Sequence, residues 1–356
     1  MKLENALALI SESVRKLKAY HLTPEDTEIK LNQNENPLDW PLEIKEQAAQ
    51  FCIERPWNRY PNFIPDELKK ELASYAGVEP SNVIIGNGSN EVLLVLMLSF
   101  LSKAPAAVIC TPTFTVYKLL ADGMGANCVN VSLTEDLEYD VPAIKKAVSE
   151  NPGSLLIICS PNNPVGNVLS EEQLREILDQ HSGICIFDQA YIEFGGFNGI
   201  KLLSEYPNLI ITRTFSKALG GAGLRLGYMI GTQELIAEIN KIKLPYNINF
   251  FSEYTASLLI KNRSFITSSV NSMIEERDSL ISFMRALPFE KVHDSMANFI
   301  LVRCSRKTQL FTHLQKSGIL VRDVSSYHLL NDCLRISVGT KEENDRLKES
   351  LKIFFA

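Results

Sequence analysis

The sequence predicts an α/β protein whose main unit is a mostly parallel, seven-stranded sheet with helices on both faces. From residue 83 onward, short apolar runs alternate with segments that have the composition of helices. Most of these runs lack the apolar–polar alternation of a half-exposed strand, so we expect both of their faces to be buried. This alternation of strands and helices is typical of a parallel sheet covered on both sides. The seven runs cover residues 83–85, 107–110, 128–133, 155–159, 184–187, 209–211 and 228–230.

The segments between these runs carry signals for the start of a helix. Ser170 is followed three residues later by Gln173, which is the pattern of a capping box. Asp140 stands before Pro142, and an acidic residue followed by proline is typical of a first helical turn. We therefore expect helices to begin near these positions, between consecutive strands.

The last part of the chain, residues 286–356, has a different character. Residues 297–302 and 333–338 alternate as half-exposed strands do, and residues 342–355 have the pattern of a terminal helix. These features predict a second, smaller unit of the α+β type.

The two expected units divide the chain unequally. Residues 3–17 have no adjacent segment in the sequence against which they could pack. We therefore expect the N-terminal segment to complete the smaller unit. Residues 251–285 are expected to form a long, polar-faced helix that joins the units. The prediction is a large domain over residues 36–250 and a small domain made of residues 1–35 together with 251–356.

Composition and charge exclude several classes of protein. A net charge of −6 without a basic stripe makes nucleic acid an unexpected partner. The seven cysteines form no C-x-x-C pair, so neither a metal site nor a disulfide framework is predicted. The longest apolar stretch, residues 92–101, is about half as long as a membrane helix. The apolar run at residues 6–10 is too short for a signal peptide, so we expect a cytoplasmic protein that has no membrane partner.

Polar or glycine-rich clusters follow five of the predicted strands directly. Four of them begin at Gly86, Thr111, Ser160 and Asp188, and the fifth is the segment around Lys217. In an open α/β sheet, ligands bind in the crevice outside the carboxyl ends of the strands. We therefore expect the five clusters to converge on one crevice.

The segment around Lys217 has the composition of a phosphate site. Thr214 and Ser216 supply two short hydroxyls, Arg225 follows nearby, and the glycines between them let the backbone approach a ligand closely. A surface lysine in a flexible loop is the alternative interpretation. The surroundings favour a lysine that reacts covalently with a phosphorylated cofactor.

Residues 214–227 match the pattern S/T-x-S-K-x-x-G-x-x-G-x-R-x-G. In this stretch the chain resembles the fold-type I pyridoxal-phosphate (PLP) aminotransferases. The resemblance implies a PLP cofactor, with Lys217 as the lysine that forms the Schiff base and then shuttles a proton. It also implies that Asp188, in a D-x-A-Y segment, keeps the pyridine nitrogen of PLP protonated. Gln189 follows that aspartate where the family usually has glutamate.

The same resemblance assigns further residues around the cofactor. Residues 161–166 match P-N-N-P-x-G, which implies that Asn163 hydrogen-bonds the phenolic oxygen of PLP together with Tyr191. Phe114 is implied to stack on the cofactor ring, although plain core packing would also explain it. Tyr60, in an R-Y-P segment, is implied to reach the cofactor phosphate of a neighbouring subunit. The implied active unit is therefore a homodimer.

The phosphate of PLP requires hydrogen-bond donors, and two segments offer them. Gly88 and Ser89 precede an apolar helix whose first N–H groups form an anion site. Thr214, Ser216 and Arg225 supply the remaining donors.

Longer matches resemble the histidinol-phosphate aminotransferase branch of the family. They lie at residues 31–37, 243–249, 321–323 and 333–344. This resemblance implies that the substrate-binding residues are Tyr20, Asn36, Arg322 and Arg335. A guanidinium can form bidentate bonds to a carboxylate or to a phosphate, as the two substrates of such an enzyme require. The implied reaction is transamination between L-histidinol phosphate or imidazole-acetol phosphate and glutamate or 2-oxoglutarate, in histidine biosynthesis.

Other functions are open at this point. A threonine-phosphate decarboxylase and an aromatic amino acid aminotransferase share the expected fold, although the lysine segment of the decarboxylase usually resembles S-L-T-K. A dehydrogenase that binds NAD would need a third glycine after Gly86 and Gly88, which is absent. A non-catalytic protein of this fold would most plausibly have lost the lysine, and Lys217 is present.

Overall fold

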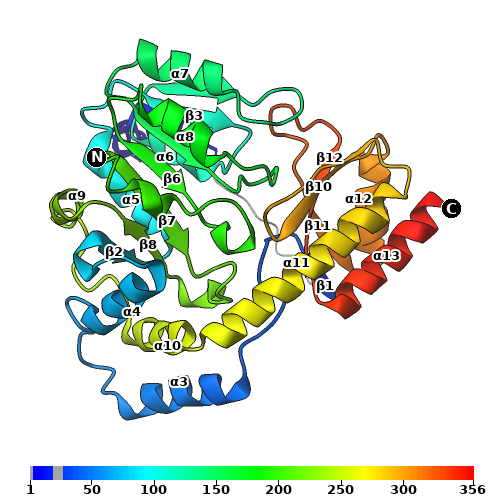
Figure 1. The fold of residues 1–356 in the computed structure, drawn as a ribbon, viewed down its shortest axis with the longest axis horizontal. Helices are drawn as coiled ribbons and strands as arrows, with labels where there is room; N and C mark the ends of the chain where they lie inside the picture. Colours follow the sequence, from blue (N-terminus) through cyan, green and yellow to red (C-terminus); the bar gives the residue numbers. More distant parts are fainter. Residues whose placement is uncertain (1–2, 19–26) are drawn as a thin grey trace.

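The computed structural model describes residues 3–18 and 27–356, and these residues contain two sheets, each packed against helices (Figure 1). In the described residues the larger sheet has seven strands. In the order in which they lie side by side they are β2 (Val83–Gly86), β8 (Gly227–Ile230), β7 (Leu209–Thr214), β6 (Cys185–Asp188), β5 (Leu155–Cys159), β3 (Ala107–Thr111) and β4 (Cys128–Ser132). Each predicted apolar run forms one of these strands, so the predicted sheet is confirmed.

The direction of the strands brings the polar clusters to one edge of the sheet. Strands β4, β3, β5, β6 and β7 are parallel. Strand β8 is antiparallel to β7 and to β2, so β2 points the same way as the parallel strands. The carboxyl ends of β2, β3, β5, β6 and β7 therefore share an edge.

Two hydrophobic cores cover the faces of this sheet, which explains the continuous apolar runs. On strand β7, Leu209 and Ile211 face one core, and Ile210 between them faces the other. The first core is formed with α4 (Asp66–Ala76), α7 (Val141–Glu150), α8 (Glu171–Leu178) and α10 (Phe250–Lys261). The second is formed with α5 (Ser89–Phe100), α6 (Val116–Gly123) and α9 (Gln233–Ile239).

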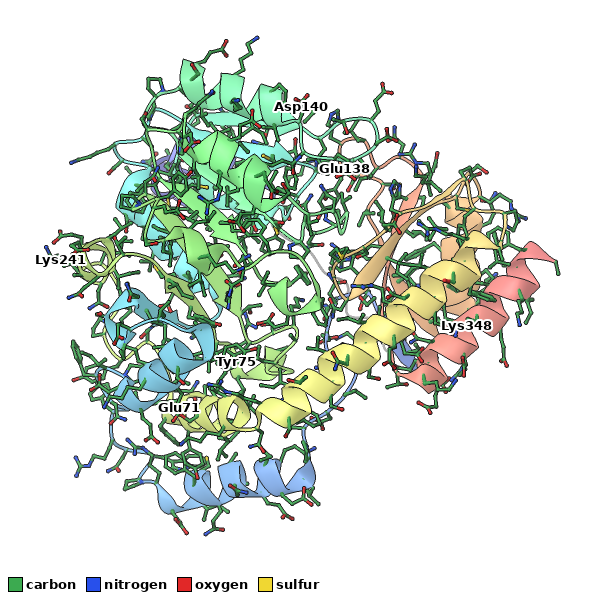
Figure 2. The ribbon with its side chains drawn as sticks, viewed as in Figure 1. Glu71, Tyr75, Glu138, Asp140, Lys241 and Lys348 are labelled. Atoms are coloured by element: carbon green, nitrogen blue, oxygen red, sulfur yellow. The ribbon has the colours of Figure 1, made fainter. Side chains whose placement is uncertain are left out.

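The predicted helix starts at α7 and α8 are confirmed. The side chain of Asp140 accepts a hydrogen bond from the backbone N–H of Ala143, and Ser170 and Gln173 form a complete capping box. Figure 2 shows Asp140 in the larger unit and Lys348 in the smaller unit. Local capping chemistry therefore sets where these two helices begin.

The smaller sheet lies in the order β1 (Ile29–Leu31), β11 (Ile319–Asp323), β12 (Cys333–Ser337), β10 (Phe299–Arg303) and β9 (Lys291–Val292). The prediction that β10 and β12 are half-exposed is wrong, because nearly every residue of both strands is buried. One face packs against α12 (Lys307–Lys316) and α13 (Lys341–Phe355), which confirms the terminal helix. The other face packs on the larger unit, where the rings of Phe299 and Tyr191 lie 5.3 Å apart.

The connection between the units is two helices where one was expected. Helix α10 ends before Asn262, and α11 (Arg263–Arg285) then runs diagonally to the smaller unit (Figure 1). Asn262 has a non-helical backbone, and its side-chain amide donates to the carbonyl of Leu258, 2.8 Å away. Asparagine competes in this way for backbone groups and so interrupts the helix. Among the described residues, no helix combines the length and apolar character needed to cross a membrane.

The N-terminal segment contacts both units. Strand β1 pairs in parallel with β11, whereas α2 (Glu12–Arg15), which follows α1 (Leu3–Ala8), packs against α6 of the larger unit. There the hydroxyl of Ser13 donates to the carbonyl of Gly123, 3.0 Å away. Helix α3 (Leu42–Glu54) packs against α10. The predicted domain limits, which group residues 1–35 with the small domain, stay a prediction.

Candidate active site

A cavity of about 530 Å³ lies at the carboxyl edge of the larger sheet, between the two units. Its walls come from loops after β2, β3, β5, β6 and β7, from the segment after β1, and from β11 and β12. The predicted site residues that line it are Ser89, Phe114, Asn163, Asp188, Tyr191, Thr214, Ser216, Lys217, Arg225, Arg322 and Arg335. The structure therefore brings these side chains together in one place.

Lys217 is half-buried in this cavity, and its ammonium donates a hydrogen bond to the carbonyl of Gln33, 2.8 Å away. Burial lowers the pKa of Lys217 to about 7, because the charged form loses its hydration, and the positive charges of Arg335 and Arg225 lower it further. Glu35 opposes this shift. The neutral amine, which is the nucleophilic form, is therefore well populated near neutral pH.

Asp188 ends strand β6 and is held by two hydrogen bonds. The hydroxyl of Tyr117 donates to its carboxylate at 2.6 Å, and the backbone N–H of Ala190 donates to its other oxygen at 3.0 Å. Burial raises the pKa of Asp188 above its ordinary value, and both hydrogen bonds oppose that shift. A buried carboxyl of this kind favours a cationic partner, such as a protonated ring nitrogen, over solvent.

Gln189 follows Asp188 but does not belong to the cavity lining. Its side-chain amide donates to the carbonyl of Phe197 at 2.7 Å and accepts from the backbone N–H of Gly199 and from Arg213. These contacts tie β6 and β7 to the loop beyond them. A neutral glutamine can make all three contacts, because it has both a donor and an acceptor.

Tyr191 and Asn163 come from the loops after the neighbouring strands β6 and β5, and both line the cavity. The hydroxyl oxygen of Tyr191 accepts a hydrogen bond from the side chain of Asn34, 3.0 Å away. The side-chain oxygen of Asn163 accepts from Arg335. The turn that presents Asn163 is fixed by Asn162, whose buried amide bonds the carbonyl of Pro112 and the hydroxyl of Thr113.

One end of the cavity is built to hold an anion. Arg225 reaches past Gly88, and a side-chain carbon at position 88 would lie 2.7 Å from its guanidinium. Gly88 also has a φ of +81° and precedes Ser89, the first residue of α5. The hydroxyls of Thr214 and Ser216, the guanidinium and the free N–H groups of α5 therefore converge, as a phosphate site requires.

The smaller unit contributes two arginines from neighbouring strands to the cavity. Arg322 on β11 and Arg335 on β12 are direct partners in the antiparallel ladder, so their side chains leave the same face of the sheet. Both line the cavity. Like charges placed opposite each other repel, and an anion bound between them would remove that cost.

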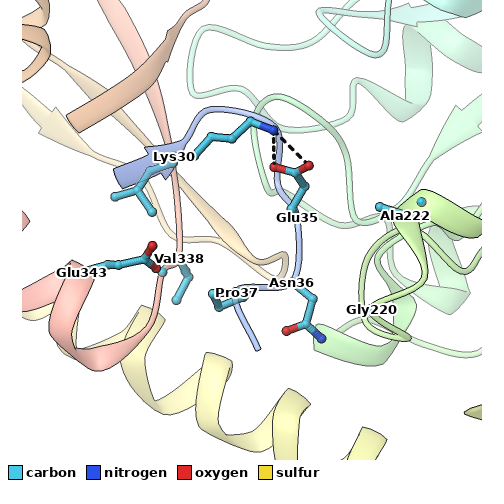
Figure 3. Close-up of a pocket in the computed structure, with 11 residues that line it drawn as sticks. Lys30, Glu35, Asn36, Pro37, Gly220, Ala222, Val338 and Glu343 are labelled. Atoms are coloured by element: carbon cyan, nitrogen blue, oxygen red, sulfur yellow. Dashed lines mark hydrogen bonds and ion pairs between the residues drawn. The ribbon is translucent and has the colours of Figure 1, made fainter. Parts of the chain in front are cut away.

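Some predicted site residues lie elsewhere. Asn36 lines a neighbouring cavity of about 290 Å³, where Lys30 and Glu35 form an ion pair (Figure 3). Its side-chain amide donates to the carbonyl of Ala218 and to the hydroxyl of Ser269. Tyr60 is exposed on the outer surface, and Tyr20 lies outside the described residues. The substrate and cofactor roles of these three residues stay predictions.

Sequence reasoning missed several residues that shape the cavity. Asn32, Gln33 and Asn34 contact Arg335, Lys217 and Tyr191 respectively. Their segment belongs to the motif at residues 31–37, but a motif does not tell which atoms its side chains contact. Tyr117 gave no signal, because it reaches Asp188 from the buried face of α6, and no motif marks that face. Tyr327 lines the cavity from the loop after β11, again without a motif.

The donor set fits PLP. A phosphate site, an amine whose pKa is about 7, a buried carboxylate and a pair of arginines lie around a single cavity. PLP needs a group for its phosphate, one for its aldehyde and one for its pyridine nitrogen, and each is present. The arginines are left for the anionic part of a substrate.

Comparisons with known proteins agree with this arrangement. The model of the family "Aminotransferase class I and II" matches residues 26–351. A histidinol-phosphate aminotransferase of Chlorobaculum tepidum is 38% identical over 329 residues, which are 92% of this chain and 94% of that protein.

Solved structures of other such proteins have the same fold. The histidinol-phosphate aminotransferase of Clostridium acetobutylicum, 25% identical, superposes with a TM-score of 0.83 over 92% of this chain and 98% of that one. That of Sinorhizobium meliloti, solved in complex with pyridoxal-5'-phosphate, has a TM-score of 0.85 at 22% identity and covers 98% of each chain. The chain therefore belongs to the aminotransferase class I and II family, in the branch of the histidinol-phosphate aminotransferases.

Proposed function

We propose that this chain transfers an amino group between L-histidinol phosphate and 2-oxoglutarate, giving imidazole-acetol phosphate and glutamate, with PLP as cofactor. The observation that carries the proposal is the cross-strand pair of Arg322 and Arg335 in the cavity of Lys217. The name of the relative that is 38% identical supports the same substrates. A cytoplasmic location, expected from the sequence, is part of the proposal.

Each residue around the cofactor has one task in this proposal. Bound PLP supplies an electron sink for the electrons released at the substrate carbon. Lys217 holds the cofactor at rest, and its released amine then moves the proton away from the substrate carbon. Asp188 holds the proton on the pyridine nitrogen, and Tyr191 and Asn163 hydrogen-bond the phenolic oxygen. Arg225 and the first N–H groups of α5 bind the phosphate.

The arginine pair explains how one site can accept two unlike substrates. Glutamate presents a carboxylate, and histidinol phosphate presents a phosphate ester. A planar guanidinium forms two parallel hydrogen bonds with either anion. Arg335 is the main anchor in this proposal and Arg322 assists it.

A substrate comparison tests the reaction. The purified protein, loaded with PLP, is expected to convert L-histidinol phosphate in the presence of 2-oxoglutarate much faster than phenylalanine. Carbon dioxide release from O-phosphothreonine without any oxo acid would identify a decarboxylase and contradict the proposal. A faster rate with phenylalanine would favour an aromatic amino acid aminotransferase.

Replacement of Arg335 by lysine is expected to lower kcat/KM about 10²-fold for glutamate and for histidinol phosphate alike. The reason is that lysine keeps the charge but cannot bind an anion in the bidentate manner, and a buried charged contact is worth several kcal/mol. Steady-state kinetics with each substrate measure the effect. Arg346→Lys, at an exposed ion pair with Glu28, is the control. Loss with only one of the two substrates would refute a shared anion site.

The chain is proposed to act as a homodimer in which Tyr60 reaches the partner's cofactor phosphate. Tyr60 is 77% exposed and stacks on Tyr246 with ring centroids 4.7 Å apart. Large apolar side chains nearby are also exposed, namely Trp57, Phe63 and Leu244. An exposed apolar patch of this kind is typical of a protein interface.

Light scattering is expected to give twice the mass of the chain. Tyr60→Phe is expected to weaken PLP binding about tenfold, because it removes one hydrogen bond to a charged group. Tyr206→Phe, which removes a surface hydroxyl bound to Asp179, serves as the control. A monomeric mass for the active enzyme would refute this part of the proposal.

A further inference from the structure

Three consecutive residues after β1 contact the three central side chains of the cavity. The carbonyl of Asn32 accepts from Arg335 at 2.7 Å, and the carbonyl of Gln33 accepts from Lys217 at 2.8 Å. The third residue, Asn34, uses its side chain, which donates to the hydroxyl oxygen of Tyr191 at 3.0 Å. Only this third contact is made by a group that mutation can remove without changing the backbone.

Asn34 is almost completely buried, and its backbone N–H, its carbonyl and its side-chain oxygen are all hydrogen-bonded. Its backbone N–H donates to the hydroxyl oxygen of Ser337 at 2.9 Å, and its carbonyl accepts from Asn298 at 3.1 Å. The hydroxyl of Ser337 in turn donates to the side-chain oxygen of Asn34, at 2.9 Å. Both Asn34 and Ser337 are at most 2% exposed, so water does not compete for these bonds.

These bonds determine which way the amide of Asn34 points. Ser337 has one hydroxyl hydrogen, and it is used on the side-chain oxygen of Asn34. If the amide were turned over, its N–H group would face Ser337, and the hydroxyl hydrogen would lose its acceptor at this contact. Because an unsatisfied buried donor is costly, the nitrogen of the amide must face Tyr191.

A donor that faces Tyr191 determines in turn how the tyrosine acts. The hydroxyl oxygen accepts from Asn34, so the hydroxyl hydrogen is left to point into the cavity. We infer that Asn34, locked by Ser337, is a positioning residue that makes Tyr191 a hydrogen-bond donor toward the phenolic oxygen of the cofactor. The inference rests on the proposed PLP site, and it concerns the electronic tuning of that site.

The consequence for the bound cofactor can be measured without turnover. A hydrogen bond donated to the phenolic oxygen stabilises the negative charge on that oxygen. It thereby lowers the pKa of the nitrogen that joins PLP to Lys217. Asn34 has a φ of +55°, which glycine adopts without strain, so Asn34→Gly removes the amide and keeps the backbone. The midpoint of the visible absorbance titration is expected to rise by about one pH unit, the size of one hydrogen bond to a charged group.

The experiment compares the PLP-bound wild type with Asn34→Gly, Tyr191→Phe and the double variant. We expect both single variants to raise the midpoint, and the double variant to titrate like Tyr191→Phe, because the amide acts through the hydroxyl. Asn127→Gly, at an exposed position before the amino end of β4, is the control and is expected to titrate as the wild type does. If Asn34→Gly does not fold, Ser337→Ala is expected to shift the midpoint in the same direction.

Two results would overturn the inference. In one, the midpoint stays unchanged in both Asn34→Gly and Ser337→Ala. In the other, Asn34→Gly shifts the midpoint equally with and without the Tyr191 hydroxyl. Failure of the wild type to bind PLP would instead refute the proposed function, so the two failures can be told apart.

Discussion

Replacement of Lys217 by alanine is expected to lower the rate of transamination by about 10⁴-fold or more. The variant loses the group that holds the cofactor and the base that moves the proton, and general acid–base catalysis alone contributes up to about 10⁴-fold. The measurement is the rate with L-histidinol phosphate and 2-oxoglutarate. Borohydride reduction followed by mass spectrometry is expected to place PLP on Lys217 in the wild type and nowhere in the variant.

The control for this experiment is Lys241→Ala. Lys241 is an exposed lysine paired with Glu238, and it lies on the outer edge of the larger unit (Figure 2). Its removal is expected to leave the rate unchanged. If Lys217→Ala still retained PLP in a form that borohydride reduces onto the protein, the assignment of Lys217 would be wrong.

The pKa of Lys217 also predicts how the protein without PLP takes up the cofactor. The amine is neutral above its pKa, and that pKa is lowered from 10.5 to about 7. The rate of covalent uptake is therefore expected to rise with pH up to about 7 and then level off. A lysine with the ordinary value would become about tenfold more reactive with each pH unit until pH 10.5. A rate that keeps rising above pH 8 would contradict the lowered pKa.

Replacement of Asp188 by asparagine is expected to have the second largest effect, a loss of about 10³-fold in kcat. Asparagine has a single acceptor oxygen, so it can keep the hydrogen bond from the backbone N–H of Ala190 while its amide nitrogen donates to the hydroxyl oxygen of Tyr117. It carries no charge to keep the pyridine nitrogen protonated. Removal of one partner from a buried charge pair costs about 3–5 kcal/mol, which corresponds to this loss.

Asp179→Asn is the matched control, because Asp179 is an exposed carboxylate bound only by the hydroxyl of Tyr206 among the contacts of the described residues. It is expected to leave kcat unchanged. PLP should still bind to Asp188→Asn through Lys217 and the phosphate site, so borohydride labelling is expected to persist. A variant that turns over at the wild-type rate would remove Asp188 from the proposed mechanism.

The sequence by itself determined the larger sheet and the composition of the site. Each of the seven strands was visible as an apolar run, since strands buried on both faces must be apolar at every position. The polar clusters after β2, β3, β5, β6 and β7 could also be recognised in the sequence, because each of them ends an apolar run. Parallel strands place their carboxyl ends at one edge, so the convergence of Lys217, Asp188 and Asn163 followed from local pattern and topology alone.

Only the tertiary structure decided which atoms contact one another. Gln33 and Lys217 are separated by 184 residues, and their hydrogen bond exists because β1 joins the smaller sheet beside the cavity. The pairing of Arg322 with Arg335 depends on the register of β11 and β12, which no single segment encodes. Both faces of β12 are buried because the larger unit covers the face that the sequence pattern left open. Side-chain directions and long-range contacts arise from the packing of the two units, so local periodicity carries no signal for them.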